Sequence, residues 1–328
     1  MQRKNVILTA GITAALIAGM VIAFVSIPVP MSLLMRKMFE FPKLSPPAGY
    51  ATMKDSVTIH SDLVYPSKYA ENTLDLYLPK EQSDSPLPVI LWVHGGAYVG
   101  GDKRDARNYC TSLAAQGYAV ISMNYARAPE ARYPIPIIQM QEVYAWLCRF
   151  EKEYSFDLSR IVLAGDSAGA HSAATFALIQ TNSDYAAKMG FKPVISAWHI
   201  RGLLLYCGPY DVPMMGDIPG FFGFMISRAG WAYFGTPHWT KDFAESATIR
   251  HHLTGDYPPV FITDANAASF KPQGQALVNA LTRVNIPVKS YFPPDTEKTT
   301  HEYQFLMDTS SGAQCYAQTL AFLSEYVN

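Results

Sequence analysis

A serine stands between two glycines in Gly165–Gly169, in the order Gly-Asp-Ser-Ala-Gly, and could act as a nucleophile. The apolar run Ile161–Leu163 precedes this turn, and the small, helix-compatible residues Ala170–Ala177 follow it. Such an order predicts a buried strand, a tight turn and a helix, with the hydroxyl of Ser167 held at the tip of the turn. By itself the pentapeptide also fits an ordinary strand-to-helix turn, so its interpretation depends on partners elsewhere in the chain.

A glycine-rich segment is the first of those partners. His94–Lys103 reads His-Gly-Gly-Ala-Tyr-Val-Gly-Gly-Asp-Lys and comes directly after the apolar run Leu87–Val93. Glycines allow bare backbone amides to face one point, as an oxyanion hole requires. The alternative is a flexible loop without a function.

The order of these two motifs resembles the α/β-hydrolase fold, in its branch of hormone-sensitive-lipase-like and feruloyl- or acetyl-esterase-like carboxylesterases. Tyr118–Tyr125 (YAVISMNY), followed by the proline-rich Ala126–Pro136, is similar to the fourth strand and the next turn of that branch. The likeness runs from about Val57 to the carboxyl terminus. It implies a serine hydrolase that cleaves carboxylic esters through an acyl-enzyme. A catalytically impaired binding or adhesion module, or a peptidase or thioesterase on the same machinery, remains an alternative.

The resemblance also implies roles for individual residues. Ser167 would be the nucleophile and His301 the base that activates it. The oxyanion would be met by the backbone amides of Gly95, Gly96 and Ala168.

The acid that orients the base is where the chain departs from the family pattern. Counted from Pro258, the usual position of this acid falls on Ala268, which cannot serve. Asp264, at the tip of the predicted strand Pro258–Thr263, is the expected acid, and Asp211 is the alternative.

Two further titratable residues lie close to the site in the sequence. His171 is four residues from the serine on the same predicted helix, and we expect it to pack beneath the site. Glu302 follows the base directly, and we expect it to point away if His301 faces the site.

Strand and helix patterns alternate through residues 56–328, which predicts a mostly parallel, doubly wound sheet with helices on both faces. The alternating segments Ser56–Val64 and Asn72–Leu78 predict an antiparallel hairpin at the edge of the sheet. Residues 211–257 are rich in aromatic side chains and are predicted to form a lid-like helical insertion over the substrate. The expected pocket residues are Tyr98, Phe222 and Trp231.

Composition limits the classes of partner. The chain has 328 residues, of which 49% are hydrophobic and 16% charged, and a net charge of −1 argues against nucleic acid. Its four cysteines show no metal-ligand spacing. We therefore expect no metal and no cofactor, and the sequence does not predict an oligomeric state.

Residues 1–30 carry a membrane signal. The uncharged run from Val6 to Ile27 would extend about 33 Å as a helix, against a hydrocarbon core of about 30 Å. We expect a single-pass anchor in the cell membrane with an extracytoplasmic catalytic domain, or secretion if the segment is cleaved. Residues 31–55 are expected to be an amphipathic juxtamembrane segment and linker, lying on the bilayer or packed on the domain. The substrate would be a small-molecule or lipid ester.

Overall fold

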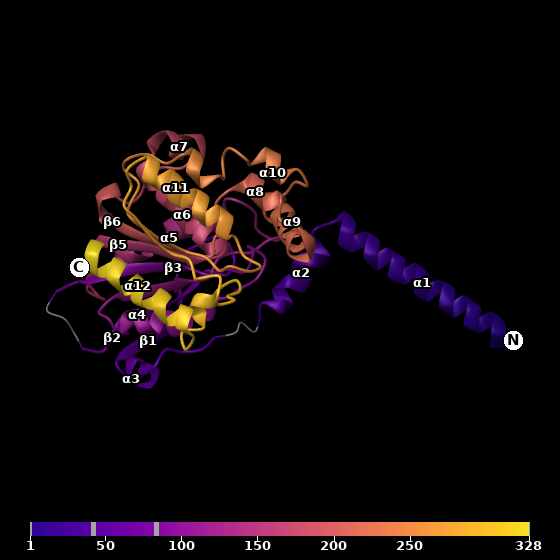
Figure 1. Ribbon diagram of the computed structural model, residues 1–328, viewed down its shortest axis with the longest axis horizontal. Coiled ribbons are helices and arrows are strands. Elements are labelled where there is room, and N and C mark those ends of the chain that lie inside the picture. The colour runs from indigo at the N-terminus through magenta and orange to yellow at the C-terminus, as the bar shows by residue number, and fades with distance from the viewer. Residues whose placement is uncertain (1, 41–43, 82–84, 328) are drawn as a thin grey trace.

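Among the residues that the computed structural model describes, eight strands form one sheet (Figure 1). The structure describes residues 2–40, 44–81 and 85–327, and in the first helix it describes side chains only at residue 9 and from residue 11 onward. The strands are β1 (Val57–Val64), β2 (Thr73–Pro79), β3 (Leu87–Val93), β4 (Ala119–Met123), β5 (Phe156–Asp166), β6 (Ile200–Tyr206), β7 (Val260–Thr263) and β8 (Val288–Tyr291).

The strands follow the order β1-β2-β4-β3-β5-β6-β7-β8. Strand β2 is antiparallel to β1 and to β4, and the other neighbouring pairs are parallel. The predicted edge hairpin and the mostly parallel sheet are therefore confirmed. Because β3 to β8 run in one direction, the loops that follow them meet at a single edge, which is where open α/β sheets bind ligands.

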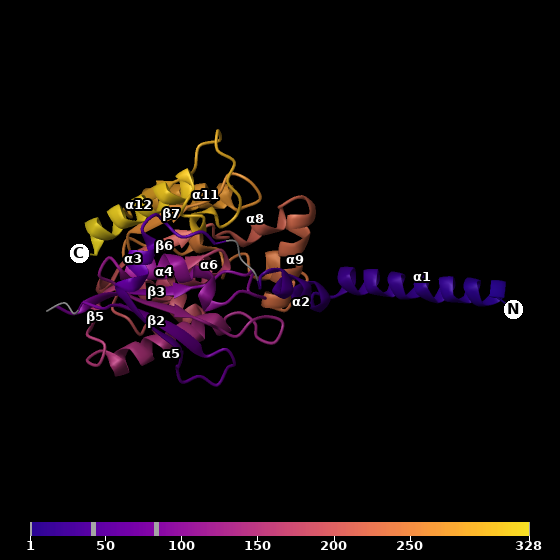
Figure 2. The same ribbon diagram turned by 90° about the horizontal axis from the view of Figure 1, so that it is seen from below.

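Helices cover both faces of the sheet (Figure 2). In β3, Leu91 and Val93 face a core shared with α5, α6 and α11, whereas Ile90 and Trp92 face a second core shared with α4 and α12. A strand buried on both faces needs a continuous apolar run rather than an alternating one. The helices are α1 (Gln2–Ser26), α2 (Val29–Met38), α3 (Tyr50–Asp55), η1 (Lys103–Ala106), α4 (Arg107–Ala114), α5 (Ile135–Phe150), α6 (Ala168–Thr181), α7 (Ser183–Lys188), η2 (Ala197–His199), α8 (Val212–Gly216), α9 (Gly220–Phe234), α10 (Trp239–Asp242), η3 (Ile249–His251), α11 (Lys271–Arg283), η4 (Tyr303–Phe305) and α12 (Ser310–Tyr326).

A helical cap, by which we mean α2, α8, α9 and α10, lies at the edge where those loops meet. Helices α8, α9 and α10 belong to the insertion at residues 211–257, and α2 comes from the amino-terminal region and packs against α9. Met31 and Met35 of α2 are buried in the same apolar cluster as Trp239 of α10. The cap therefore joins two segments that are far apart in the sequence.

Helix α1 projects away from the rest of the molecule (Figure 1). Among the described residues, no single helix has the length and hydropathy to cross a membrane, whereas Gly11–Ser26 and Val29–Met38 meet those requirements together, with a bend of 88° between them. In α2, Met31, Ser32 and Met35 are buried, so this helix packs on the domain. Residues 41–43 of the expected linker lie outside the described residues.

Candidate active site

Ser167 occupies a strained turn between β5 and α6. Its φ of 51° and ψ of −120° are rarely adopted by a residue with a side chain, and such strain gathers at functional sites. A Cβ at Gly169 would lie 1.9 Å from the carbonyl oxygen of Val93, so the turn can pass β3 only with glycine there. The predicted strand, turn and helix around the serine are therefore present.

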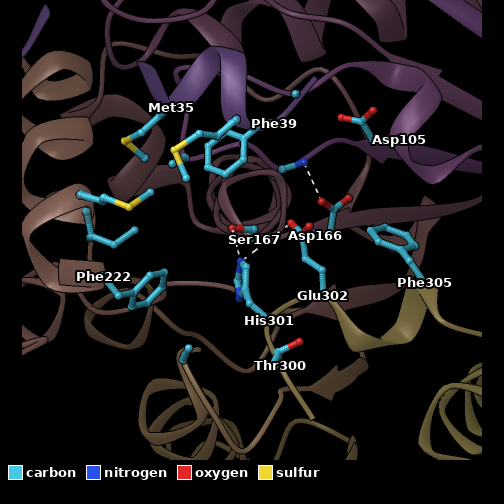
Figure 3. A pocket seen from close by; sticks show the side chains of 18 of the residues that line it. Met35, Phe39, Asp105, Asp166, Ser167, Phe222, Thr300, His301, Glu302 and Phe305 are labelled. Carbon is cyan, nitrogen blue, oxygen red and sulfur yellow. Dashed lines mark hydrogen bonds and ion pairs between the residues drawn. The ribbon is translucent and has the colours of Figure 1, made fainter. Parts of the chain in front are cut away.

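His301 lies on the loop between β8 and η4 and reaches the serine (Figure 3). Its Nε2 is 2.9 Å from the hydroxyl oxygen of Ser167. The imidazole lies near the rings of Phe222 and Phe270, with centroid distances of 6.2 Å and 5.4 Å. Burial lowers the pKa of His301 to about 4, so the ring is neutral at pH 7 and can accept a proton.

The predicted acid does not touch the histidine directly. Asp264 follows β7 and is fully buried, and its Oδ1 accepts a hydrogen bond from the hydroxyl of Ser269. That same hydroxyl oxygen is 2.8 Å from Nδ1 of His301. Burial raises the pKa of Asp264 to about 7, against the opposing effect of its hydrogen bonds. Ser269 was not predicted from the sequence, although it lies one residue after the position where the family carries its acid.

The alternative acid, Asp211, is engaged elsewhere. Its carboxylate forms an ion pair with Arg250, with Nε and Oδ2 2.6 Å apart, and caps α8 by accepting from the amide of Met214. His171 also lies outside the catalytic chain, because its Nε2 is 2.9 Å from the carbonyl oxygen of Ala247. Its predicted packing role is confirmed.

The glycine-rich loop is held against the serine turn. The amide of Gly95 donates to Oδ2 of Asp166 over 2.7 Å, so it is not free to meet an oxyanion, and the prediction for this residue is wrong. Within the described part of the chain, the amides of Gly96, Ala97 and Ala168 have no acceptor among the hydrogen bonds outside regular helices and strands. Ala168 is the first residue of α6, where amides lack partners within the helix.

A pair of carboxyl groups lies beside these amides. Asp166 accepts from Nε1 of Trp92 over 2.8 Å and shares a hydrogen bond with Glu302. Burial and the charge of Asp166 raise the pKa of Glu302 well above its usual range, so Glu302 carries the shared proton. Its Oε1 is 3.8 Å from Nε2 of His301, and the expectation that Glu302 points away from the site is wrong.

Two cavities meet at the nucleophile. The larger has a volume of about 410 Å³ and is closed on one side by α2 and α9, with Met35, Phe39 and Phe222 in its wall (Figure 3). The smaller, of about 20 Å³, is an apolar slot formed mainly by cap side chains. Ser167 and Ile226 line both cavities.

The three predicted pocket residues lie in different places. Phe222 lines the larger cavity, and Tyr98 lines the smaller one with its ring stacked on Tyr233 at 3.8 Å. Trp231 lines neither cavity and packs instead beside Arg228, so its prediction is wrong. Among the described residues, no group of three His, Cys, Asp or Glu side chains is arranged to hold a metal ion.

The family model described as BD-FAE matches residues 74–281. The chain belongs to the BD-FAE family. Its similar relatives include the esterase LipQ of Mycobacterium tuberculosis, 30% identical over 222 residues that cover 66% of this chain and 50% of LipQ. An acetyl esterase of Salmonella paratyphi B is 26% identical over 268 residues, which are 76% of each chain. This chain covers only part of several curated relatives: the matched region is between 34% and 52% of the length of LipQ and three further esterases.

Solved structures show the same fold. Esterase B of Lactobacillus rhamnosis has a TM-score of 0.74 at 21% identity, over 99% of this chain and 96% of that one. A bacterial heroin esterase has a TM-score of 0.67 at 21% identity, over 85% of this chain and 88% of that one. These structures confirm the predicted α/β-hydrolase fold, and the family model with the curated relatives confirms the predicted esterase branch.

The BD-FAE protein departs from the expected family pattern at the acid that orients the histidine. Ala268 occupies the expected position and has a φ of 49°. The loop carries its carboxylate four residues earlier, on Asp264, and places Ser269 between that carboxylate and the imidazole. The sequence contained both residues, but only the fold of this loop brings the hydroxyl to the histidine.

Proposed function

We propose that this protein is a serine carboxylesterase. The observation that carries the proposal is the 2.9 Å contact between Nε2 of His301 and the hydroxyl of Ser167 at a strained turn. A neutral imidazole accepts the hydroxyl proton as the oxygen of Ser167 attacks the ester carbonyl. When the tetrahedral intermediate collapses, the bond to the alcohol oxygen breaks, and this oxygen takes from His301 the proton that came from Ser167. Water, activated by the same imidazole, then releases the acid and restores the serine.

The developing oxyanion needs hydrogen-bond donors that are already in place. We assign this role to the amides of Gly96, Ala97 and Ala168. They belong to residues that line the two cavities at the serine and, among the described residues, have no competing acceptor in the loop and turn hydrogen bonds. Loss of one such donor costs about 3–4 kcal/mol of transition-state stabilisation in a well-studied protease.

Cavity size suggests the class of ester. A cavity of about 20 Å³ exceeds the roughly 10–15 Å³ that one water requires, so it suits a group the size of a methyl. We assign the small cavity to a short acyl group and the 410 Å³ cavity to the alcohol part. Similarity to an acetyl esterase and to Esterase B, which has been solved with a C4-C4 SN3 tributyrin phosphonate, supports short acyl chains.

We further propose that the amino-terminal segment, residues 1–30, anchors the enzyme in the cell membrane, with the catalytic domain on the extracytoplasmic side. The support is the exposed apolar surface of α1, together with Leu33 and Leu34 of α2, which are 45% and 43% exposed. Deletion of residues 1–27 should move the protein from the membrane fraction to the supernatant. Retention in a carbonate-washed membrane after this deletion would contradict the proposal.

The esterase proposal is tested with a fluorophosphonate probe, which reacts with activated serines. Wild-type protein should be labelled, and Ser167→Ala should not. Ser172→Ala is the matched control, because this buried serine of α6 bonds to the carbonyl of Ala168 and lines neither cavity. Absence of labelling in the wild type would favour the catalytically impaired binding module.

A second measurement addresses the base. His301→Ala should lower the turnover of p-nitrophenyl acetate by at least about 10⁴-fold, in line with loss of a triad member in other serine hydrolases.

A further inference from the structure

A single hydroxyl separates the buried carboxylate from the imidazole. We propose that Ser269 is a positioning residue, which holds His301 in the tautomer that activates Ser167 and connects it to Asp264. This inference rests on the proposed esterase function. It adds a fourth member to the chain of hydrogen bonds, at a residue to which the family pattern gives no role.

The directions of these hydrogen bonds follow from Asp264. Its Oδ1 accepts from the backbone amides of Ala265 and Phe270, over 2.8 Å and 3.3 Å, and backbone amides can only donate. Oδ1 is therefore an acceptor, and a proton on this carboxyl group would sit on Oδ2. The hydroxyl of Ser269, which also meets Oδ1, must be the donor in that contact.

The tautomer of His301 follows from this direction. Because the single hydroxyl proton of Ser269 points to Asp264, its oxygen must accept from the imidazole, 2.8 Å away at Nδ1. A neutral imidazole with a proton on Nδ1 has a free lone pair on Nε2. That lone pair faces the hydroxyl of Ser167 and can take its proton.

The loop keeps the carboxylate from replacing this hydroxyl. Asp264 is fully buried at the end of β7, and its Oδ1 is held by two backbone amides as well as by Ser269. In the described chain, Oδ2 has no hydrogen-bond partner. After Nε2 takes the proton of Ser167, it keeps that proton until the leaving alcohol accepts it. In the meantime Ser269, with the carboxylate behind it, stabilises the imidazolium without taking a proton from it.

Imidazole ¹⁵N NMR tests the inference without depending on activity. The signal of His301, assigned by its loss in His301→Gln, should show a protonated Nδ1 and an unprotonated Nε2 in the wild type. Ser269→Ala should shift it to a mixture of both tautomers, and Ser269→Thr should preserve it. A protonated Nε2 in the wild type, or an unchanged signal in Ser269→Ala, would overturn the inference.

Kinetics with p-nitrophenyl acetate provide the second test, in protein first shown to react with the fluorophosphonate. Ser269→Ala should lower kcat by about 10²–10⁴-fold with little change in KM, the range for loss of a general-base contribution. Asp264→Asn should cost only roughly tenfold, because its amide oxygen still accepts from Ser269 and only the charge is lost.

The double variant separates a connected chain from two independent effects. Once the hydroxyl is absent, Asp264 has no route to the imidazole, so Ser269→Ala/Asp264→Asn should be no slower than Ser269→Ala. Ser269→Thr should retain most of the wild-type rate. Multiplied losses in the double variant would show that Asp264 acts on His301 without Ser269. A near-normal rate in Ser269→Ala would show that the hydroxyl is not needed, and either result would overturn the inference. Failure of the wild type to react with the phosphonate would instead count against the esterase proposal and leave the NMR result to decide the role of Ser269.

Discussion

Among single residues, Asp264, the carboxylate that we propose acts on His301 through Ser269, lowers the stability of the fold when it is ionised. Burial raises the pKa of Asp264 from 3.8 to about 7. Between these two values the folded protein binds more protons than the unfolded chain, so the contribution of Asp264 to stability falls as the pH rises from about 4 to about 7. A residue that cannot ionise would not lose stability in this pH range if it replaced Asp264.

Asp264→Asn should therefore gain stability relative to the wild type as the pH rises. At pH 4 the variant should be the less stable protein, because its amide NH₂ places two donors at the position of Oδ2, where the protonated carboxyl group has one. Oδ2 has no partner among the described residues. At pH 8 it should be the more stable one, by about 2 kcal/mol. Chemical unfolding between pH 4 and pH 9 measures both proteins. Asp256→Asn, at an exposed carboxylate, is the control, and a difference independent of pH would contradict the expectation.

At the scale of elements, helix α9 separates the two cavities at the nucleophile. Ile226 lines both of them, whereas its neighbour Met225 lines only the larger one. Ile226→Ala should join the two spaces and admit longer acyl chains. The ratio of kcat/KM for the butyrate ester to that for the acetate ester should rise by about tenfold or more, the value of a methylene or two in an apolar pocket. Met225→Ala, which enlarges only the larger cavity, should leave this ratio unchanged, and an equal rise in both variants would contradict the assignment of the acyl group.

The helices and strands differ in how far the sequence predicts them. The strands were predictable because burial on both faces requires unbroken apolar runs, as in β3 and β5. The nucleophile and base were predictable because their types and order carry the chemistry. The cavity wall formed by α2 was not predictable, because it depends on packing between α2 and α9. These helices are far apart along the chain, so no local sequence pattern records their contact. The engagement of the Gly95 amide and the position of Ser269 likewise arise from contacts between separate loops.

On the surface of the molecule, the two helices that wall the larger cavity, α2 and α9, carry exposed apolar side chains. Leu34 of α2 is 43% exposed, and Phe221, at the start of the helix against which α2 packs, is 64% exposed. If this surface meets the bilayer, as the proposed anchor implies, the double variant Leu34→Ser/Phe221→Ser should hydrolyse a vesicle-embedded ester about tenfold more slowly or worse. Its rate on a soluble ester should not change.

Trp198 offers a matched control for that experiment. It is 80% exposed and lies just before β6, at the opposite edge of the sheet from the site. Trp198→Ser should leave both rates unchanged. Equal rates of the double variant and the wild type on the embedded ester would count against contact between this surface and the membrane.

The participation of α2 in the cavity wall limits how the protein can mature. Any processing that frees the enzyme from a membrane has to cut before Val29, close to the 88° bend that follows Ser26. A cut within α2 would shorten this wall, and a cut after Phe39 would remove both Met35 and Phe39 from the chamber beside the nucleophile. Helix α1, which would direct the enzyme to the membrane, is thus followed within three residues by α2, which the mature enzyme needs for its cavity wall.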